Sequence, residues 1–376
     1  MEEPDVVIIG AGPAGTATAA EINDRSDKQV VLIDRRKEIG VPGRCAGGIG
    51  YEQMELVKLK VPRHVVTNDV YGMKLFSPNG TEVTFEDKGP LGYIVDRPKF
   101  DQWMHSRCDP EKTETLLGTP ARTNGDIVTC GTRKFRPKTI VLATALDIKH
   151  AQQAGVNVWV DPSDIHKCTQ VTVETRKFDQ KYLWLYFGKE PAPEGYAWVF
   201  PESDTRVRIG LSIPLLRPEN IQSLLKEFLL HHDLSTAPKS FQTGKLIPTI
   251  YYKKSIVTGK VALVGDAGFQ CDPATGGGVG HAILCGKLLG WCIVRGTPLS
   301  TYDAEWRGFI AKKMETDYII KRLLASFTDS ELDGFAVALK GLGLRSPADI
   351  PSAGMKILKG NRRLLWKAMK LKIFRM

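Results

Sequence analysis

The chain has 376 residues, of which 42% are hydrophobic and 25% are charged, and its formal net charge is +10. A chain of this length usually divides its core, so we expect two interleaved domains with enough volume to bury a cofactor. No run of about 18 consecutive apolar residues occurs, which argues against a membrane-spanning helix. The composition is typical of a large globular protein that does not cross a bilayer.

The N-terminus and the cysteines indicate the cellular compartment. Glu2 and Glu3 precede the first apolar segment, where a secretory signal would carry positive charge. The seven cysteines are scattered, and none forms a Cys-x-x-Cys pair or a His/Cys spacing suited to zinc. We therefore expect a cytoplasmic protein with reduced thiols, no disulfide framework and no metal site.

Residues 5–36, DVVIIGAGPAGTATAAEINDRSDKQVVLIDRR, predict a strand, a glycine turn, an Ala-rich helix and a second strand. Gly10, Gly12 and Gly15 have the G-x-G-x-x-G spacing, and Asp34 ends the second strand. Such a unit predicts a dinucleotide site, because the glycines admit a pyrophosphate to the helix N-terminus and the acid binds ribose hydroxyls. A purely structural turn is the alternative. The neighbouring arginines, Arg35 and Arg36, leave NADP open at this point.

A second glycine-rich turn lies far downstream, within residues 259–290. There a strand ends at Gly265 and Asp266, and a turn with Pro273 leads through Gly276–Gly278 into another helix. A long cofactor with two binding ends needs an acid for its polyol chain and a positive helix end for its anionic ring. The two turns together therefore predict FAD.

The remaining segments predict a sheet and a helical end. Residues 70–85 alternate around a Pro-Asn-Gly turn and predict a β-hairpin. Residues 168–186 and 196–213 are rich in β-branched and aromatic residues and predict strands of an antiparallel sheet. From about residue 300 the pattern becomes helical.

These elements predict an α/β chain, α+β overall, with a Rossmann-like FAD-binding domain, an inserted antiparallel β-sheet substrate domain and a C-terminal helical region. The expected bounds are 1–65, 92–150 and 255–300 for the FAD-binding domain, 66–91 and 151–254 for the substrate domain, and 301–376 for the helical region with its basic tail.

Four motifs stand in an order found in one flavoprotein family: GAGPAG at 10–15, RCAGG at 44–48, DRPKFD at 96–101, and GDA followed by PATGGG within 265–278. A fifth, EGYAWVFP at 194–201, resembles the Y-x-W-x-F-P signature of its reductases. Over most of residues 1–300 the sequence resembles the FAD-dependent geranylgeranyl reductase family, of the digeranylgeranylglycerophospholipid reductase type. That family lies within the larger group of flavoproteins built like p-hydroxybenzoate hydroxylase.

The resemblance implies FAD in an extended form, with Asp34 on the adenosine ribose, Arg97 near the cofactor's centre and Asp266 on the ribityl chain. A helix that begins near Val279 would present its positive end to the flavin ring. Residues 144–146, Thr-Ala-Leu, depart from the Ala-Asp-Gly usual in related flavoproteins. The cofactor-binding residues implied by the resemblance are Gly10, Gly12, Pro13, Ala14, Gly15, Asp34, Arg35, Arg44, Cys45, Ala46, Gly47, Arg97, Gly265, Asp266, Pro273, Gly276, Gly277, Gly278 and Val279.

The reaction implied by the resemblance saturates isolated C=C bonds in geranylgeranyl chains of membrane lipid precursors, with hydride from flavin N5 and a separate proton. An isolated alkene has no carbonyl, so a proton donor, a dry pocket and aromatic faces toward a cationic centre would lower the barrier. We expect an isoprenoid lipid substrate and no nucleic acid partner. Because no second dinucleotide fingerprint occurs, the electron donor would be reduced ferredoxin, which suits a basic protein, or NAD(P)H.

Cys45 and one aromatic strand supply the candidate functional residues. Cys45 and Tyr196 are candidate proton donors, with Cys45 ranked first; a small buried packing residue is the other interpretation of Cys45. Tyr196, Trp198 and Phe200 repeat with period two, so they share one strand face and predict an apolar wall for an isoprenoid chain. A hydrophobic core stripe is the alternative for this strand.

Other functions remain open on the same scaffold. An FAD-dependent aromatic monooxygenase or hydroxylase shares the overall arrangement and the Gly-Asp motif. A flavin halogenase is a more distant alternative, since no catalytic-lysine motif supports it. The non-enzyme alternative is a lipid-binding flavoprotein whose flavin is structural.

Residues 354–376 form a basic, partly apolar tail with eight Lys or Arg and no Asp or Glu. Such a segment suits an anionic membrane surface, and peripheral contact with the inner membrane surface is one interpretation. An ordinary packed helix with a solvated basic face is the other.

Overall fold

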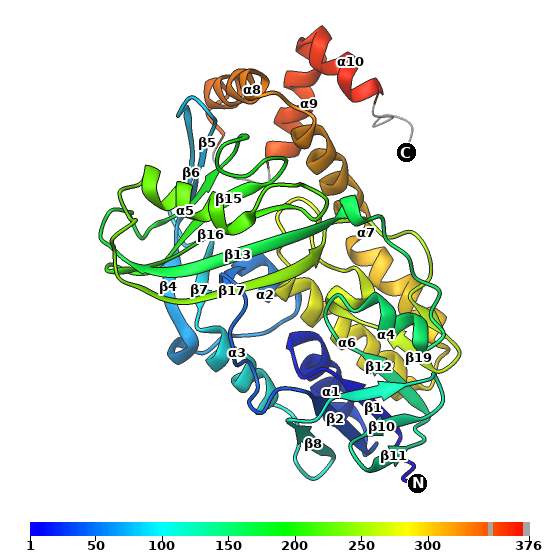
Figure 1. The fold of residues 1–376 in the computed structure, drawn as a ribbon. Helices are drawn as coiled ribbons and strands as arrows, with labels where there is room; N and C mark the ends of the chain where they lie inside the picture. The colour runs from blue at the N-terminus through cyan, green and yellow to red at the C-terminus, as the bar shows by residue number, and fades with distance from the viewer. Residues whose placement is uncertain (345–348, 371–376) are drawn as a thin grey trace.

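The computed structural model describes residues 1–344 and 349–370, apart from the side chains of residues 241–243, 351, 355, 362, 368 and 370. It is a mixed α/β fold with a Rossmann-like unit at the end that holds the N-terminus (Figure 1). A large, mostly antiparallel sheet lies in the middle, and the last helices lie at the opposite end. This arrangement confirms the predicted fold class.

The Rossmann-like unit is built on a six-stranded sheet whose strands are parallel except for the edge strand β18. Its central strand β1 (Val6–Ile9) runs into α1 (Pro13–Arg25) and then β2 (Val30–Asp34), which confirms the predicted strand–helix–strand unit. Across the sheet the order is β18 (Val257–Thr258), β19 (Val261–Leu263), β12 (Thr139–Leu142), β1, β2 and β8 (Thr113–Leu117).

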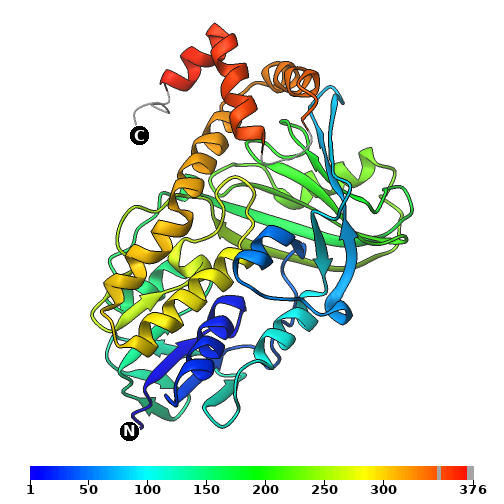
Figure 2. The ribbon, with the colours of Figure 1, turned by 180° about the vertical axis from the view of Figure 1, so that it is seen from behind.

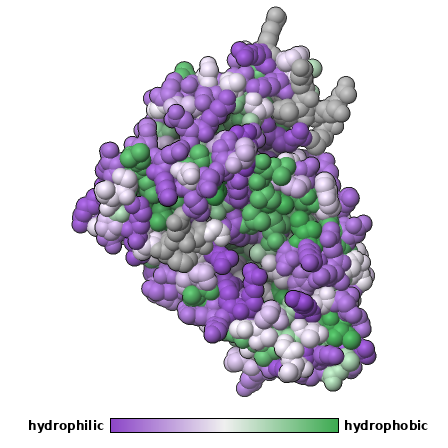
Figure 3. Space-filling model, viewed as in Figure 1, coloured by the Kyte–Doolittle hydropathy of each residue, from purple (hydrophilic) through white to green (hydrophobic). Residues whose placement is uncertain are grey.

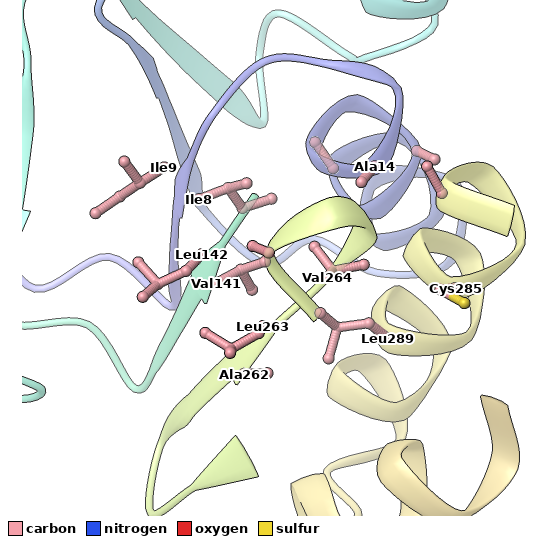
Figure 4. Close-up of a cluster of buried hydrophobic side chains, with 14 of the residues drawn as sticks. Ile8, Ile9, Ala14, Val141, Leu142, Ala262, Leu263, Val264, Cys285 and Leu289 are labelled. Carbon is pink, nitrogen blue, oxygen red and sulfur yellow. The ribbon is translucent and has the colours of Figure 1, made fainter. Parts of the chain in front are cut away.

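Two helices cover one face of this sheet at close range. α1 packs against α6 (Val279–Arg295), and a Cβ placed on Gly286 would come within 2.5 Å of the Ala14 carbonyl oxygen. The glycine therefore allows the two helix backbones to approach. Figure 4 shows aliphatic side chains of β1, β12 and β19 gathered beside those of α1 and α6. Burial of this apolar surface is the main stabilising term of the unit.

Smaller elements surround the unit. A three-stranded antiparallel meander precedes β12, and two short helices flank the sheet. They are β9 (Ala121–Thr123), β10 (Val128–Cys130), β11 (Arg133–Phe135), α3 (Arg97–His105) and α4 (Ile148–Gln153).

The second large sheet has seven strands, antiparallel except between β14 and β5. It contains the predicted antiparallel strands, and β5 and β6 form the predicted hairpin. Alternate residues of one face, such as Val171, Ile209 and Leu211, pack with α5 (Ile221–His231). The order is β17 (Lys239–Pro248), β13 (Ile165–Glu174), β16 (Arg206–Pro214), β15 (Tyr196–Ser203), β14 (Tyr182–Tyr186), β5 (Gly72–Phe76) and β6 (Glu82–Glu86).

A small third sheet joins β3 (Gly48–Gly50), β7 (Gly92–Val95) and β4 (Val66–Val70), and α2 (Tyr51–Leu56) follows β3. Its strands come from both sides of the domain boundaries expected from the sequence. It holds the loop that precedes β3 against the large sheet, since the central strand β15 of that sheet also contacts β4 and β7.

The C-terminal region is helical, as predicted, with α7 (Leu299–Ala325), α8 (Asp329–Gly341), α9 (Ile350–Gly360) and α10 (Arg362–Lys370). Figures 1 and 2 show α7 running along the molecule from the Rossmann-like unit to the end formed by α8–α10. A separate apolar cluster joins these helices to the hairpin through Phe85, Phe327 and Phe335. Among the described residues, none of the helices is both long and apolar enough to span a membrane.

Candidate active site

A cavity of about 620 Å³, here the larger cavity, lies at the carboxyl ends of β1, β2 and β12. Ligands of open α/β sheets bind at this edge. Of the residues predicted to hold the cofactor, Gly15, Ala46, Gly47, Pro273 and Gly277 do not line it. The predicted residues that line it are Gly10, Gly12, Pro13, Ala14, Asp34, Arg35, Arg44, Cys45, Arg97, Gly265, Asp266, Gly276, Gly278 and Val279.

The glycine turn after β1 is shaped for close approach of a ligand. Gly10 has a φ of +113°, and a Cβ there would lie 2.2 Å from the Ala143 carbonyl oxygen, so only glycine fits. Asp34 accepts a hydrogen bond from the Ala11 N–H at 2.9 Å and pairs with the Arg36 guanidinium at 2.9 Å. Burial alone would raise the pKa of Asp34, but these hydrogen bonds outweigh it and lower the pKa. The Asp34 carboxylate is therefore ionised beside the glycine turn.

Two buried polar atoms in the larger cavity have no hydrogen-bond partner among the described residues. They are Thr144 Oγ1 and His150 Nε2. Burial lowers the pKa of His150, so its imidazole is neutral and can donate or accept one hydrogen bond there. An unpartnered buried polar group is costly unless a ligand or water satisfies it. These atoms, with the glycine cradle and the acid, fit a nucleotide at this end of the cavity.

The RCAGG stretch forms the loop before β3 and is held by the large sheet. Arg208 on β16 donates hydrogen bonds to the carbonyls of Cys45 and Ala46 at 3.2 and 3.0 Å. Gly47 has a φ of +85°, and a Cβ there would lie 2.6 Å from Arg208 Nη1. A Cβ on the next residue, Gly48, would lie 2.9 Å from the Phe200 ring. The glycines of this motif therefore make room for an arginine and an aromatic ring.

The Cys45 thiol lies beside a buried ion pair. Arg97 and Asp101 pair across one helical turn of α3 at 3.0 Å, and both side chains are buried. Burial alone would raise the pKa of Cys45, but the Arg97 guanidinium, the Gly47 N–H and the Lys245 ammonium together lower it. The arrangement favours the thiolate. It also shows that Arg97 is an inward-facing cation of the larger cavity and not a surface ion pair.

Lys245 of β17 is a cavity residue that the sequence did not reveal. Its ammonium pairs with Asp266 at 2.5 Å, and both line the larger cavity. Burial would lower the pKa of Lys245, but pairing with Asp266 raises it, so the ammonium stays charged. No local motif marks this lysine, because its place depends on the register of β17.

The loop before α6 is held by hydrogen bonds within the loop and by a lysine of α7. The Asp272 carboxylate accepts hydrogen bonds from the Ala274 and Thr275 N–H groups, each at 3.0 Å. Lys313 of α7 binds both Asp272 and Asp317 at 2.5 Å. This bracing fixes the three glycines that lead into α6, whose N-terminal end carries a partial positive charge.

The aromatic strand faces the Rossmann-like unit. Tyr196, Trp198 and Phe200 stand opposite Ser212, Gly210 and Arg208, so the three rings share one face of β15 as predicted. Tyr196 lines a smaller cavity of about 130 Å³ together with apolar residues, among them Phe187, Ile247, Leu324 and Phe327. Trp198 packs over Gly210, and Phe200 packs over Gly48. Gly276 lines both cavities, so they meet at that residue.

Comparisons with known proteins agree with this site. Residues 164–247 match the family model described as geranylgeranyl reductase catalytic domain, and residues 8–59 match an NAD(P)-binding Rossmann-like domain. Digeranylgeranylglycerophospholipid reductase 2 of Methanococcoides burtonii is 30% identical over 96% of this chain and 94% of its own length. The chain belongs to the digeranylgeranylglycerophospholipid reductase family.

The reductase also shares its fold with solved structures. A geranylgeranyl bacteriochlorophyll reductase-like protein from Thermoplasma acidophilum has a TM-score of 0.89 at 23% identity, covering 99% of this chain and 100% of its own. The flavin-dependent brominase Bmp2 has a TM-score of 0.69 at 16% identity, covering 96% and 100%. These similarities establish the flavoprotein fold, and with the family they make the reductase an FAD-dependent oxidoreductase.

Proposed function

We propose that the reductase saturates isolated C=C bonds in geranylgeranyl chains of membrane lipid precursors. The observation that carries this proposal is the meeting of two cavities at Gly276. The larger has the glycine turn, acid and helix end that a dinucleotide requires. The smaller has aromatic and aliphatic side chains that suit an isoprenoid chain, and charged side chains, among them Arg217 and Lys321, also line it. A lipid chain in the smaller cavity would therefore end beside the flavin.

The chemistry divides between the cofactor and the chain. Bound FAD, once reduced, supplies the hydride. The chain must bind the alkene in a dry place, place a proton near its other carbon and stabilise the positive character that develops there. The N-terminal end of α6, which begins at Val279, favours negative charge next to Gly278.

Cys45 and Tyr196 take separate roles in this proposal. The Arg97 guanidinium helps to lower the pKa of Cys45, and a more acidic thiol donates its proton more readily, so we keep Cys45 as the proposed proton donor, the role expected first from the sequence. Burial raises the pKa of Tyr196, so its hydroxyl stays protonated and donates to the Thr275 carbonyl. Its ring supplies the wall of the smaller cavity, and we assign it to substrate binding.

An anaerobic reaction tests the proposed function. The reduced protein is mixed with a digeranylgeranylglycerophospholipid, flavin reoxidation is followed by absorbance, and the lipid is examined by mass spectrometry. We expect reoxidation and a gain of two hydrogens for each double bond reduced. Absence of lipid-dependent reoxidation would overturn the proposal. Oxygen-dependent NAD(P)H consumption with an aromatic substrate would instead indicate a monooxygenase.

For the electron donor we propose reduced ferredoxin. The formal net charge of +10 favours encounter with an acidic iron–sulfur protein, and this attraction weakens as salt rises. Stopped-flow reduction of the flavin by ferredoxin should be faster than by NADPH at low salt and should slow at high salt. Equal rates with NADPH at low salt would contradict this choice.

We further propose peripheral contact with an anionic membrane surface through α9 and α10. Lys356, Lys359 and Arg363 are exposed there, beside the exposed apolar side chains of Trp366 and Met369. Basic and apolar groups exposed together on neighbouring helices are typical of surface-bound segments. Residues 371–376 of the basic tail lie outside the described residues.

A further inference from the structure

Lys245 lies close to the junction of the two cavities. Its Nζ pairs with Asp266 Oδ2 at 2.5 Å, and both residues line the larger cavity. Ile247 is two residues further along β17 and therefore points to the same face of the strand. A Cβ on Gly276 would lie 2.9 Å from Ile247 Cδ1, and Gly276 lines both cavities. The Lys245–Asp266 pair therefore occupies the end of the larger cavity that adjoins the smaller one.

The Lys245 ammonium has hydrogen-bond donors that the chain does not use. An ammonium group carries three N–H donors. Among the residues that the structure describes, Asp266 is the one hydrogen-bond partner of the Lys245 side chain. That side chain is 34% exposed and lines the larger cavity, so its remaining donors are open to a ligand there.

Asp266 lies between this ammonium and the N-terminal end of α6. Its Oδ2 accepts a hydrogen bond from Lys245, whereas its Oδ1 would lie 3.2 Å from a Cβ on Gly278, the residue before α6. Within the described part of the chain, no side chain caps the first N–H groups of α6, and its first turn has no acidic residue. This helix end therefore keeps its partial positive charge. Without Lys245, the Asp266 carboxylate would place an uncompensated negative charge beside it.

The charge at this end of the cavity matters for a flavin. Two electrons and one proton convert a neutral flavin ring into an anionic reduced ring, so a positive charge nearby favours the reduced form. The glycine turn and Asp34 suit the nucleotide half of FAD, which leaves the end with Lys245 and α6 for the ring. Removing the Lys245 charge would change the pair from neutral to negative and would favour the oxidised form.

We propose that Lys245 raises the reduction potential of the bound FAD by neutralising Asp266 beside the flavin ring. A higher potential allows a weaker reductant to deliver the two electrons. The proposal rests on FAD binding, and it holds whichever substrate takes the hydride.

Anaerobic titration of the FAD-loaded full chain, in equilibrium with a dye of known potential, tests this proposal. At a fixed potential, Lys245→Met should shift the ratio of oxidised to reduced flavin about tenfold toward the oxidised form, which is about 30 mV for a two-electron couple. Lys245→Arg keeps the charge and should stay near the wild-type potential. Lys260→Met is the matched control, because Lys260 also pairs with an aspartate, Asp126, but lines neither cavity. Its potential should equal that of the wild type.

The sign of the shift separates charge from a structural role of the pair. Asp266→Asn removes the carboxylate and leaves the ammonium, so its potential should rise above that of the wild type. Combining Asp266→Asn with Lys245→Met removes both charges and should bring the potential back near the wild-type value. If the pair only held the loop in place, both single variants would shift the potential in the same direction and the double variant would not recover it.

Each result bears on Lys245 alone. An unchanged potential in FAD-loaded Lys245→Met would overturn the proposal, and so would shifts of the same sign in Lys245→Met and Asp266→Asn. Lys245→Gln is the second uncharged variant; if it and Lys245→Met both fail to retain FAD, measured by flavin absorbance per chain, the lysine binds the cofactor and does not tune it. The titration contains no lipid, so these results leave the proposed lipid substrate untouched. Failure of the lipid to reoxidise the wild type would likewise leave the measured potentials in place.

Discussion

Burial raises the pKa of the Cys45 thiol, and the Arg97 guanidinium is the leading cause that lowers it. Arg97 is held by Asp101 on the same helix and lies beside Cys45, so the positive charge cannot turn away to solvent. Burial raises the pKa of Cys168, on the neighbouring sheet, and the Lys245 ammonium opposite it does not offset that effect. The pKa values of two thiols near one site are thus shifted in opposite directions by their surroundings.

This contrast predicts different alkylation profiles for the two cysteines. The pH midpoint of Cys45 modification by iodoacetamide should lie below 9.0, and that of Cys168 should lie near 11. Only the thiolate reacts, so the midpoints report the pKa values and not accessibility. Mass spectrometry of the two peptides across a pH series measures both in one sample. A Cys45 midpoint at or above that of Cys168 would contradict the electrostatic account.

Gly47 predicts a stability effect. Its positive φ and the 2.6 Å approach to Arg208 Nη1 and the Val95 carbonyl leave no room for a methyl group. Gly47→Ala should therefore lower the free energy of unfolding by about 1–3 kcal/mol. Gly89→Ala is the matched control, because its Cβ would meet nothing within 4 Å and its change should stay within about 0.5 kcal/mol. Urea unfolding of the two variants checks this; equal stabilities would refute it.

At the scale of elements, α7 holds two parts of the site through ion pairs. Lys313 holds Asp272, whose carboxylate orders the loop before α6, and Lys321 of the same helix pairs with Asp164 before β13. One helix therefore contacts both the loop beside the larger cavity and the start of the large sheet. Helix position and loop shape are coupled by these ion pairs, in which the carboxylates are largely buried, and a buried carboxylate that loses its partner is strongly destabilising.

Asp317, also on α7, should make the free energy of unfolding depend on pH. Burial and the neighbouring Asp272 carboxylate raise the pKa of Asp317 to about 6, above that of an unfolded aspartate. Folding thus takes up a proton between about pH 4 and 6, so this group's stabilisation is complete below that range and is lost as pH rises through 6. Asp317→Asn stays neutral, and its stability relative to wild type should rise by about 1–3 kcal/mol from pH 4 to 7.

Urea unfolding at four pH values between 4 and 7 measures this difference. Thr316→Ser lies on the same helix and is the control, because neither side chain titrates and its stability difference from wild type should stay constant over the range. A constant difference for Asp317→Asn as well would show that Asp317 titrates normally.

At the scale of the whole molecule, the two ends differ in character. The Rossmann-like unit and the N-terminus form one end, and α8–α10 form the other (Figure 2). The face drawn in Figure 3 is mostly hydrophilic but carries one broad hydrophobic area near its middle. The smaller cavity is lined partly by the end of α7 and the start of α8, through Leu324 and Leu332. A membrane-bound α9–α10 would therefore place this cavity on the membrane side.

Vesicle binding tests that orientation. Lys356→Glu with Lys359→Glu should lower cosedimentation with phosphatidylserine-containing vesicles at least about fivefold, since each basic residue near an anionic surface contributes about 1 kcal/mol. Deletion of the tail is less suitable, because Leu358 and Leu364 belong to a packed cluster. Lys37→Glu with Lys134→Glu, exposed on the Rossmann-like unit, is the matched charge control. Equal loss of binding in both double variants would show non-specific attraction.

The sequence alone determined the local motifs, whose residues lie close together in the chain. The glycine turn with Asp34, the hairpin, the alternating face of the aromatic strand and the late Gly-Asp motif all depend on residues close together in the chain. Such patterns constrain local backbone geometry directly, so the FAD-binding fold and the reductase family could be predicted before the structure.

Only the tertiary structure decided which distant residues complete the site. Lys245 and His150 line the larger cavity, and Arg208 binds the loop before β3. None of the three carries a local signal, because each is placed by strand register or by packing between elements. A shift of one residue in β13 or β17 would turn Cys168 or Lys245 to the opposite face. The same packing lowered the pKa of Cys45 and placed Phe200 over Gly48 instead of in the smaller cavity. Charge state and side-chain direction follow from the neighbours that folding brings together, which spacing along the chain does not specify.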